Sequence, residues 1–206
     1  MSRPTLSRTQ KTSLSIALLL LAATLAGIGA YATFTDSASA NHSVTTGTVS
    51  IDLGATGAST NRLNVDATAV APGDTMQRSF DLSNSGSLNL SGITLTTNAS
   101  TSSLLDTNAT DGLQMVIDRC SNAWTESGSS PAFTYACSGS TSTVVASRAV
   151  IGANIALSNL TVTTTGNTDH LRLTLTLPTT AGNAFQGLTS TIAYSFTGIQ
   201  RAATDR

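Results

Sequence analysis

Hydrophobic residues follow two patterns in this chain of 206 residues. Residues 16–32, IALLLLAATLAGIGAYA, form a nearly unbroken apolar run. From Ser43 onward, short apolar groups are separated by Thr and Ser, and in several of them every second residue is apolar. In residues 171–177, four leucines alternate with arginine and threonine. A period of two puts the leucines on one face of a β-strand, so this pattern predicts strands with one buried and one wet face.

Ten segments fit such strands: residues 49–53, 63–70, 76–82, 88–95, 113–117, 132–135, 143–146, 155–162, 171–177 and 192–196. Turn residues separate them, as in Pro72-Gly73-Asp74. The polar stretch 99–110 is expected to be a loop with one helical turn near Leu104 and Leu105. The chain is therefore predicted to be all-β, an antiparallel β-sandwich, because a single open sheet of this length would expose its apolar face and its edges. Periodicity allows both jelly-roll and immunoglobulin-like topologies.

The apolar run has the features of an export signal. Three basic residues precede it, and it ends in the small-x-small triplet Ala30-Tyr31-Ala32. We expect residues 1–32 to be a helical signal peptide, cut between Ala32 and Thr33, with residues 38–40 as a later alternative. A permanent membrane anchor is the rival interpretation. The run is at the short limit for a spanning helix, and no basic cluster follows it.

Cleavage would leave residues 33–206, enough for one domain with a sizeable core. This mature chain has seven basic and eleven acidic residues, a net charge of −4, and no lysine. Nucleic acid and anionic lipid bind through clustered Lys and Arg, so neither is an expected partner. Only 10% of residues are charged, and Ser, Thr, Gly, Ala and Asn take their place. Such a composition is typical of an extracellular β-protein or of a disordered tract, and the period of two favours the folded sheet.

Two cysteines, Cys120 and Cys137, follow the apolar run. An even number of cysteines in an exported chain predicts a disulfide, here one that closes a loop containing Trp124 and Pro131. A catalytic cysteine would need a nearby histidine, and a zinc site would need more ligands than two thiols supply.

Candidate catalytic residues are few. The two histidines, His42 and His170, are far apart in sequence, and neither belongs to an H-E-x-x-H pair. Asp111 and Asp118 come nearest to an acidic cluster but lack the alternate spacing of a calcium loop. The one glutamate, Glu126, lies between the cysteines. We therefore predict no catalytic residue, no metal site and no cofactor.

Three parts of the sequence carry a likeness to a known family. They are residues 29–36 together with 46–53 (GAYATFTD and TGTVSIDL), residues 71–88 (APGDTMQRSFDLSNSGSL), and residues 186–200, which contain Tyr194-Ser195-Phe196 and end in Gln200. These stretches resemble the TasA/camelysin family of exported bacterial matrix proteins. Residues 99–160, with both cysteines, differ from TasA itself and look like an actinobacterial-type member.

The resemblance implies a precursor cut by a signal peptidase of the SipW type, and a jelly-roll domain released to the cell surface or the biofilm matrix. Only the uncut signal peptide would hold it at the membrane. The resemblance also implies self-association into fibres by donor-strand exchange, in which an N-terminal segment completes the sheet of the next subunit. Residues 33–53 are the candidate donor, with Phe34, Val44, Val49 and Ile51 entering the partner's groove. The same segment could instead be the edge strand of its own domain.

Two other functions have to be weighed. The camelysin branch carries a metalloprotease label, and hydrolytic zinc usually takes three protein ligands beside a general base. Here Asp169, His170 and a distant acid would have to converge. A monomeric adhesin or carbohydrate-binding module would rely on Trp124 and a few other aromatic residues to stack on sugars. The leading prediction is a non-enzymatic, fibre-forming subunit of the extracellular matrix.

Overall fold

The computed structural model describes residues 46–64, 66 and 69–204. The chain divides into two units, Met1–Val44 and Thr45–Arg206, and only the second contains described residues. The predicted signal peptide and its cleavage site at Ala30, Ala32 and Thr33 lie outside the described residues. So do Phe34, His42 and Val44.

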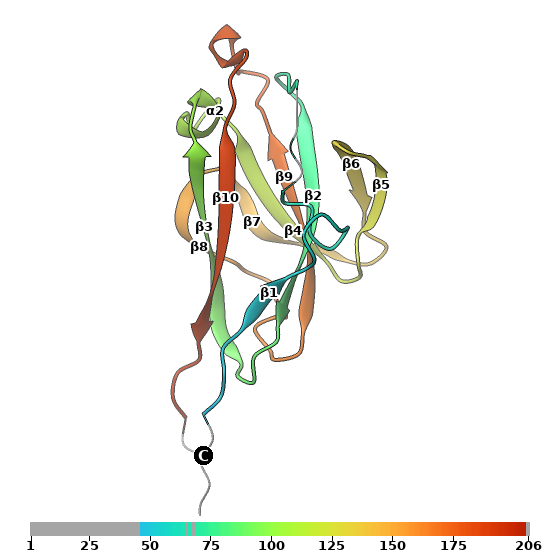
Figure 1. Ribbon diagram of the computed structural model, residues 1–206, viewed down its shortest axis with the longest axis vertical. Helices are drawn as coiled ribbons and strands as arrows, with labels where there is room; N and C mark the ends of the chain where they lie inside the picture. Colours follow the sequence, from blue (N-terminus) through green and yellow to red (C-terminus); the bar gives the residue numbers. More distant parts are fainter. Residues whose placement is uncertain (1–45, 65, 67–68, 205–206) are drawn as a thin grey trace, which may run out of the picture. The chain divides into compact units, whose positions relative to one another are not determined.

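Antiparallel strands form two sheets and a hairpin in the described part of the chain (Figure 1). The larger sheet has the order β1-β2-β9-β4-β7, with bounds Ile51–Leu53, Thr75–Asn84, Thr168–Thr176, Gln114–Cys120 and Thr141–Ala149. The smaller sheet has the order β10-β3-β8, with bounds Thr191–Gln200, Leu90–Thr101 and Gly152–Ala156. The hairpin pairs β5 (Thr125–Ser129) with β6 (Ala132–Ala136). One helical turn, α2 (Leu104–Thr107), and one 3₁₀ turn, η1 (Asn183–Phe185), complete the unit.

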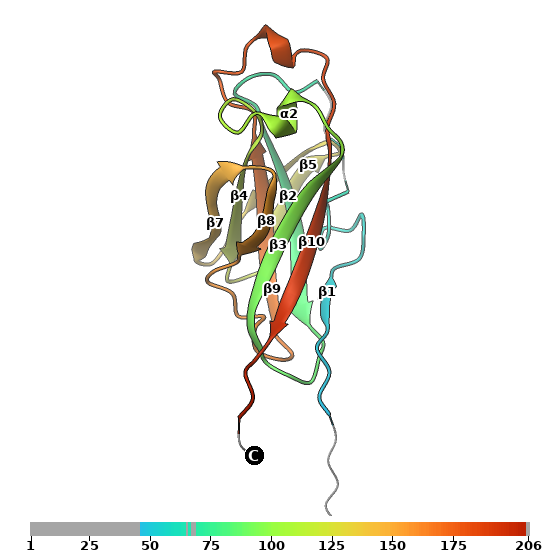
Figure 2. The same ribbon diagram turned by 90° about the vertical axis from the view of Figure 1, so that its left-hand side faces the viewer.

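The two sheets lie face to face, and their inward side chains form one hydrophobic core (Figures 1 and 2). Leu95 of β3, Met115 of β4 and Leu171 of β9 are completely buried. Across the core, the ring centroids of Phe80 and Phe196 lie 5.3 Å apart. The predicted all-β, antiparallel β-sandwich is confirmed.

Strand β9 shows how the period of two produces this core. Leu171 and Leu173 point inward and are buried, while Arg172 lies on the outer face. The Arg172 guanidinium forms an ion pair with Asp118 of the neighbouring strand, with 3.0 Å between Nη2 and Oδ2. The apolar side chains are thus buried away from water on one face of the strand, and the polar side chains between them pair with each other on the other face.

One predicted strand does not form in its described part, and another is shorter than predicted. Residues 63–70 form no strand in their described part, and Ala69 has a φ of 55°, a left-handed conformation outside the strand region. The predicted strand 155–162 ends at Ala156 as β8. Asn159, at φ 56°, turns the chain away from the sheet, although Val162 is still buried in the core.

The predicted loop 99–110 contains the expected helical turn. Strand β3 extends into it as far as Thr101, and α2 follows. Ser103 caps this turn, because its Oγ accepts a hydrogen bond from Leu105 N. In return, Ser103 N donates a hydrogen bond to Asp106 Oδ1.

The second unit has a core of its own. Side chains from both sheets and from the loops between them belong to one buried cluster inside Thr45–Arg206. A compact unit with a two-layered core meets the usual requirement for independent folding.

Candidate assembly surface

The second half of the predicted donor segment belongs to its own domain. Strand β1 pairs with β2 in the register Ile51↔Asn84 to Leu53↔Leu82. Before it, Thr48 N donates to Ser87 Oγ at 2.8 Å, and Ser87 N donates to Thr48 O at 2.9 Å. Ile51 packs on the core, whereas Val49 is 42% exposed. The described half of the segment is therefore an edge strand of its own sandwich, and Phe34 and Val44 lie outside the described residues.

On one side of the sandwich, no described strand lies between β10 and the Thr75 half of β2, although Leu63 and Val70 of the segment before β2 pack on the core. Among the described strands, β10 pairs with β3 alone, and β1 reaches only the last three residues of β2. The chain after β1 continues along β2 as far as Ser79, whose O accepts a hydrogen bond from Arg62 N at 2.8 Å. The inward side chains of β10, Ile192, Tyr194 and Phe196, are only half-buried, and so is Met76 of β2. We call this region, with the four half-buried side chains, the open seam. In contrast, Leu95 at the same level of β3 is completely buried.

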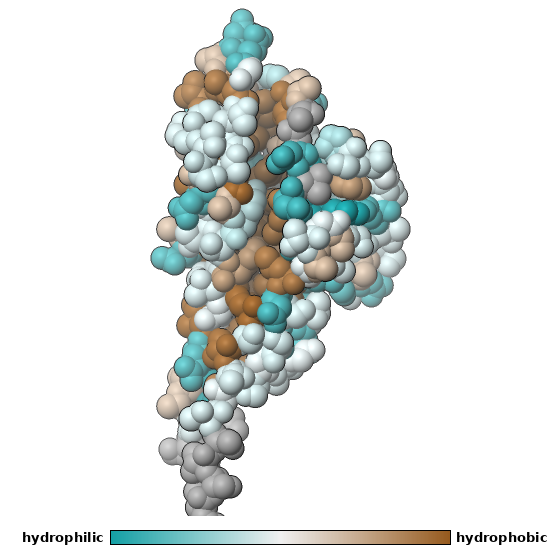
Figure 3. Space-filling view, in the orientation of Figure 1, coloured by the Kyte–Doolittle hydropathy of each residue, from teal (hydrophilic) through white to brown (hydrophobic). Residues whose placement is uncertain are grey.

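Figure 3 shows the open seam from outside. Hydrophobic side chains gather along a line that runs between the two sheets on this face. The Tyr194 hydroxyl lies in the enclosed part of this region, because burial raises its pKa and the charge of Arg78 opposes the rise only in part. An unpaired strand edge beside partly exposed core residues is a ready template for another β-strand. The seam is therefore the candidate assembly surface.

The opposite side of the sandwich is a poorer candidate. A groove of about 550 Å³ lies between β7 and β8, and its lining includes Ala146, Ser147, Arg148 and Asn154. Ser158 N donates to Val144 O at 3.2 Å and closes one end of this side. Small and polar side chains there offer little apolar area to an incoming strand.

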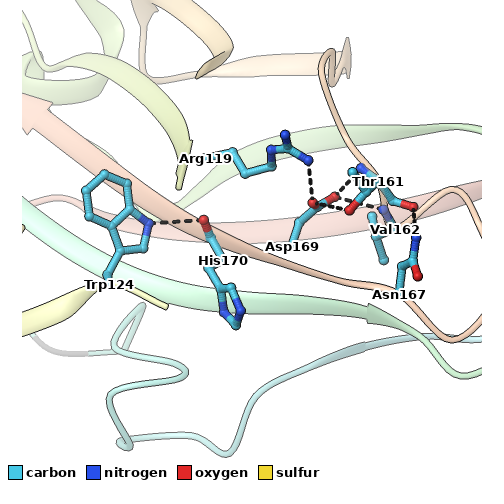
Figure 4. Close-up of polar contacts among 7 residues, drawn as sticks. All are labelled: Arg119, Trp124, Thr161, Val162, Asn167, Asp169 and His170. Carbon is cyan, nitrogen blue, oxygen red and sulfur yellow. Dashed lines mark hydrogen bonds and ion pairs between the residues drawn. The ribbon is translucent and has the colours of Figure 1, made fainter. Parts of the chain in front are cut away.

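Asp169, which a zinc peptidase would need as a ligand, is a structural residue. Its side chain is 2% exposed and accepts four hydrogen bonds (Figure 4). The donors are Arg119 Nη1 at 3.0 Å, Thr161 N at 2.7 Å, Thr161 Oγ1 at 2.6 Å and Val162 N at 2.8 Å. These bonds hold the loop before β9 against the sheet and occupy both carboxylate oxygens.

His170 points away from Asp169, because successive residues of a strand face opposite sides (Figure 4). Its Nδ1 lies 2.7 Å from Asp81 Oδ1 on the outer face of the larger sheet. The adjacent Asp169 and His170 are therefore not brought together as ligands of one metal.

The other candidate acids also have partners of their own. Asp118 pairs with Arg172, and Asp111 accepts a hydrogen bond from Thr180 Oγ1 at 2.7 Å. Glu126 binds Arg62 at 2.6 Å, and that hydrogen bond holds the pKa of the carboxyl below its ordinary value. Among the described residues, no three His, Cys, Asp or Glu side chains form a group that could hold a metal ion.

Cys120 and Cys137, the two cysteines expected to pair, form a disulfide with 5.7 Å between their Cα atoms. It closes the segment that carries the β5–β6 hairpin. Trp124 lies in this segment, with the Arg172 guanidinium 4.4 Å from its ring centroid and its Nε1 donating to His170 O at 3.0 Å. Arg172 covers one face of the ring, so at most the other face could stack on a sugar.

Sequence reasoning missed two features of this region. Strand β5 has the sequence TESGS, which contains no apolar residue to produce a period of two. The sequence signal that could have found it is the run of turn residues Gly128-Ser129-Ser130-Pro131 directly before the predicted strand 132–135. The open seam was also missed, because an unpaired edge depends on the order of strands in the sheets.

The described residues include no helix long and apolar enough to cross a membrane. No protein with a curated description matches the chain. The sequence model for camelysin metallo-endopeptidase matches residues 7–205, which is almost the whole chain, and it agrees with the likeness carried by the N-terminal and C-terminal segments. The chain therefore belongs to the camelysin metallo-endopeptidase family.

Proposed function

We propose that this protein is an exported structural subunit that assembles into fibres in the extracellular matrix. In this proposal, residues 33–45 of one subunit lie along β10 in the open seam of the next. The observation that carries the proposal is the seam itself, where core side chains of β10 are only half-buried beside an edge that pairs with no other described strand. Strand addition at such an edge supplies main-chain hydrogen bonds and covers the apolar side chains.

The sequence of the proposed donor suits this site. Phe34, Ala38, Ala40 and Val44 are separated by even numbers of residues, so they share one face of an extended strand. Residues 33–44 would span about 40 Å, against about 34 Å for the ten residues of β10. The donor is therefore long enough to cover the whole edge and to place small and large apolar side chains against the seam.

The place where the chain enters β1, after Thr46, favours insertion of the donor segment into a partner's seam over insertion into the protein's own seam. Strand β1 already occupies the Gly198 end of the region between β2 and β10, since a Cβ at Gly198 would lie 3.3 Å from Ile51 Cγ2. The chain enters β1 at this end (Figure 1). The preceding residues would have to reverse direction to fill their own seam, whereas a second subunit at this end could receive them without a turn.

Export would control this assembly. Residues 1–32 would tether the donor to the membrane until a signal peptidase of the SipW type cuts after Ala32. The new N-terminus at Thr33 would then be free to enter another subunit. Uncut protein would remain monomeric at the membrane.

The test compares a chain that begins at Thr33 with one that lacks residues 33–41. Size-exclusion chromatography and electron microscopy report the assembly state. We expect fibres from the first chain and monomers from the second. Monomers from both, or fibres from both, would overturn strand donation by this segment.

A peptidase activity is the second candidate, because the family's description names a metallo-endopeptidase. Hydrolytic zinc needs convergent ligands and a general base. Asp169 and His170 face opposite sides of β9, and Asp169 is saturated by four hydrogen bonds. These residues do not fit a zinc site, so we propose that the chain is not an enzyme. Stoichiometric zinc together with cleavage of casein by the purified protein would overturn this.

A further inference from the structure

The outer face of the smaller sheet has an unusual surface. Its side chains include Thr94 and Thr96 of β3 and Ala193, Ser195 and Thr197 of β10. They point outward, because Leu95 and Phe196 between them point into the core. We call this surface the uncharged face.

No residue of β3, β8 or β10 is charged. The outer face of the larger sheet, in contrast, carries Asp81, Asp118, His170 and Arg172. Figure 2 looks toward the smaller sheet, and no described element crosses it from outside. The charged residues of the described domain therefore belong to the larger sheet, the hairpin, α2 and the loops, and of these the Arg148 guanidinium lies against Gly152 of β8.

The side chains of the uncharged face form rows across the strands. Thr197 lies beside Thr94, which lies beside Ala156, and Ser195 lies beside Thr96. All of these side chains are short, so the face lacks large projections along most of its length. Near its end, Ile199 is 46% exposed beside Gly92, where a Cβ would meet open space.

We propose that the uncharged face binds the same face of a second copy of this protein. A threonine or serine hydroxyl both donates and accepts a hydrogen bond, so two such faces can satisfy each other. Covering two such faces removes no charged side chain from water. Covering the outer face of the larger sheet would do so, and that desolvation would be costly. Rigid β-branched threonines also lose little side-chain freedom on contact.

Other partners fit this face less well. Nucleic acid and anionic lipid require basic residues, and none lies on these strands. Sugars commonly stack on aromatic rings, but Phe196 and Tyr194 point inward. The remaining match is another flat, uncharged, hydroxyl-bearing face, and a second copy supplies one.

The contact is small. The strands β10, β3 and β8 have ten, twelve and five residues, and at about 3.4 Å per residue and about 4.8 Å spacing they cover on the order of 450 Å² per partner. A stable interface buries about 800 Å² per partner, so a single contact would be weak, and repetition along two fibres would strengthen it. This inference does not rest on strand donation, because the uncharged face and the open seam are different surfaces.

The test uses the unit Thr45–Arg206, which has its own core and lacks the proposed donor segment. Amide chemical shifts are followed by NMR as the protein is diluted from about 1 mM to about 20 μM, a range suited to weak self-association. We expect concentration-dependent shifts at residues of β3, β8 and β10. Shifts confined to other strands, or no shifts at all, would overturn the proposal.

Matched variants sharpen the result. Thr197→Glu puts a charge on the uncharged face, and Thr141→Glu puts the same charge on β7, at another exposed threonine. We expect Thr197→Glu to weaken self-association at least about tenfold, because like charges would meet across the contact. Thr141→Glu should leave it unchanged. Equal effects of both charges would show that net charge, and not this face, governs association.

Discussion

At the scale of single residues, the charged side chains of this domain serve the fold. Asp169 is buried, and its four hydrogen bonds join Arg119, the loop at Thr161 and Val162, and strand β9. Glu126 and Arg62 are 64 positions apart in sequence and tie the hairpin to the chain before β2. These pairs explain why so few charged residues are enough for an ordered domain.

The buried carboxylate gives the first prediction. Asp169→Ala leaves Arg119, the Thr161 N–H and the buried Val162 N–H without their acceptor, so we expect the free energy of unfolding to fall by about 3 kcal/mol. Urea denaturation followed by circular dichroism measures this. The control Asp111→Ala removes one exposed hydrogen bond and should cost about 1 kcal/mol or less. Equal losses in the two variants would contradict the structural role of Asp169.

Glu126 gives a prediction about pH. The hydrogen bond from Arg62 holds the pKa of Glu126 below its ordinary value of 4.5. Because the folded-state pKa is the lower one, the pair contributes its full stability above about pH 4.5 and loses it as the pH falls through the folded-state pKa. The stability difference between the wild type and Glu126→Gln should therefore be constant near neutral pH and shrink below about pH 4. Thermal unfolding over this range tests it, and a difference that grows on acidification would contradict it.

At the scale of elements, the disulfide-bonded hairpin is expected to contribute to stability, and the open seam is the element proposed for assembly. The hairpin packs on the outer face of the larger sheet, where Tyr135 N donates to Gln77 Oε1 at 3.2 Å. The disulfide closes it at a separation of 17 residues. The seam lies at the free edge of β10, in the other sheet.

Removing the disulfide should lower the free energy of unfolding of the domain but leave the β-sandwich folded. For Cys120→Ser/Cys137→Ser, we expect the free energy of unfolding to fall by about 3 kcal/mol in the chain-entropy model. Far-ultraviolet circular dichroism should stay close to that of the wild type, because the core of both sheets lies outside the hairpin. Loss of all β-structure in the double variant would contradict this division.

A charge in the seam should block assembly and spare the fold. Ile192 is only half-buried, so the glutamate of Ile192→Glu can reach water in a monomer. A donor strand would bury that charge without a partner, at a cost of several kcal/mol. We expect the variant that begins at Thr33 to be a folded monomer by light scattering. Ala193→Glu, on the opposite face of β10, is the control and should still form fibres.

The sequence was most informative where a strand has one buried face. The alternation of leucine with polar residues located β9, and similar patterns located β2 and β10. Strand β5 lacked this signal, and the alternation at residues 63–70 was misleading, since Ala69 is left-handed there. Contacts such as Asp81 with His170 depend on strand order, as does the free edge of β10. Strand order is a property of the packed sheets, which local periodicity does not encode.

At the scale of the whole molecule, we propose two separate surfaces for contact with other copies of this domain. The open seam would accept a strand along the fibre, and the uncharged face would contact a neighbouring fibre. The charge of the described residues lies elsewhere, mainly on the larger sheet, the hairpin and the loops. A net charge of −4 on the chain from Thr33 would keep contacts between the remaining surfaces weak.

Mixing two incomplete subunits tests the central claim most directly. The chain lacking residues 33–41 keeps the seam but has lost most of the donor, and Ile192→Glu keeps the donor but has a blocked seam. We predict that each is monomeric alone and that the mixture forms one-to-one dimers, measured by size-exclusion chromatography with light scattering. A mixture that stays monomeric, or fibres from the chain without residues 33–41, would contradict strand donation between subunits.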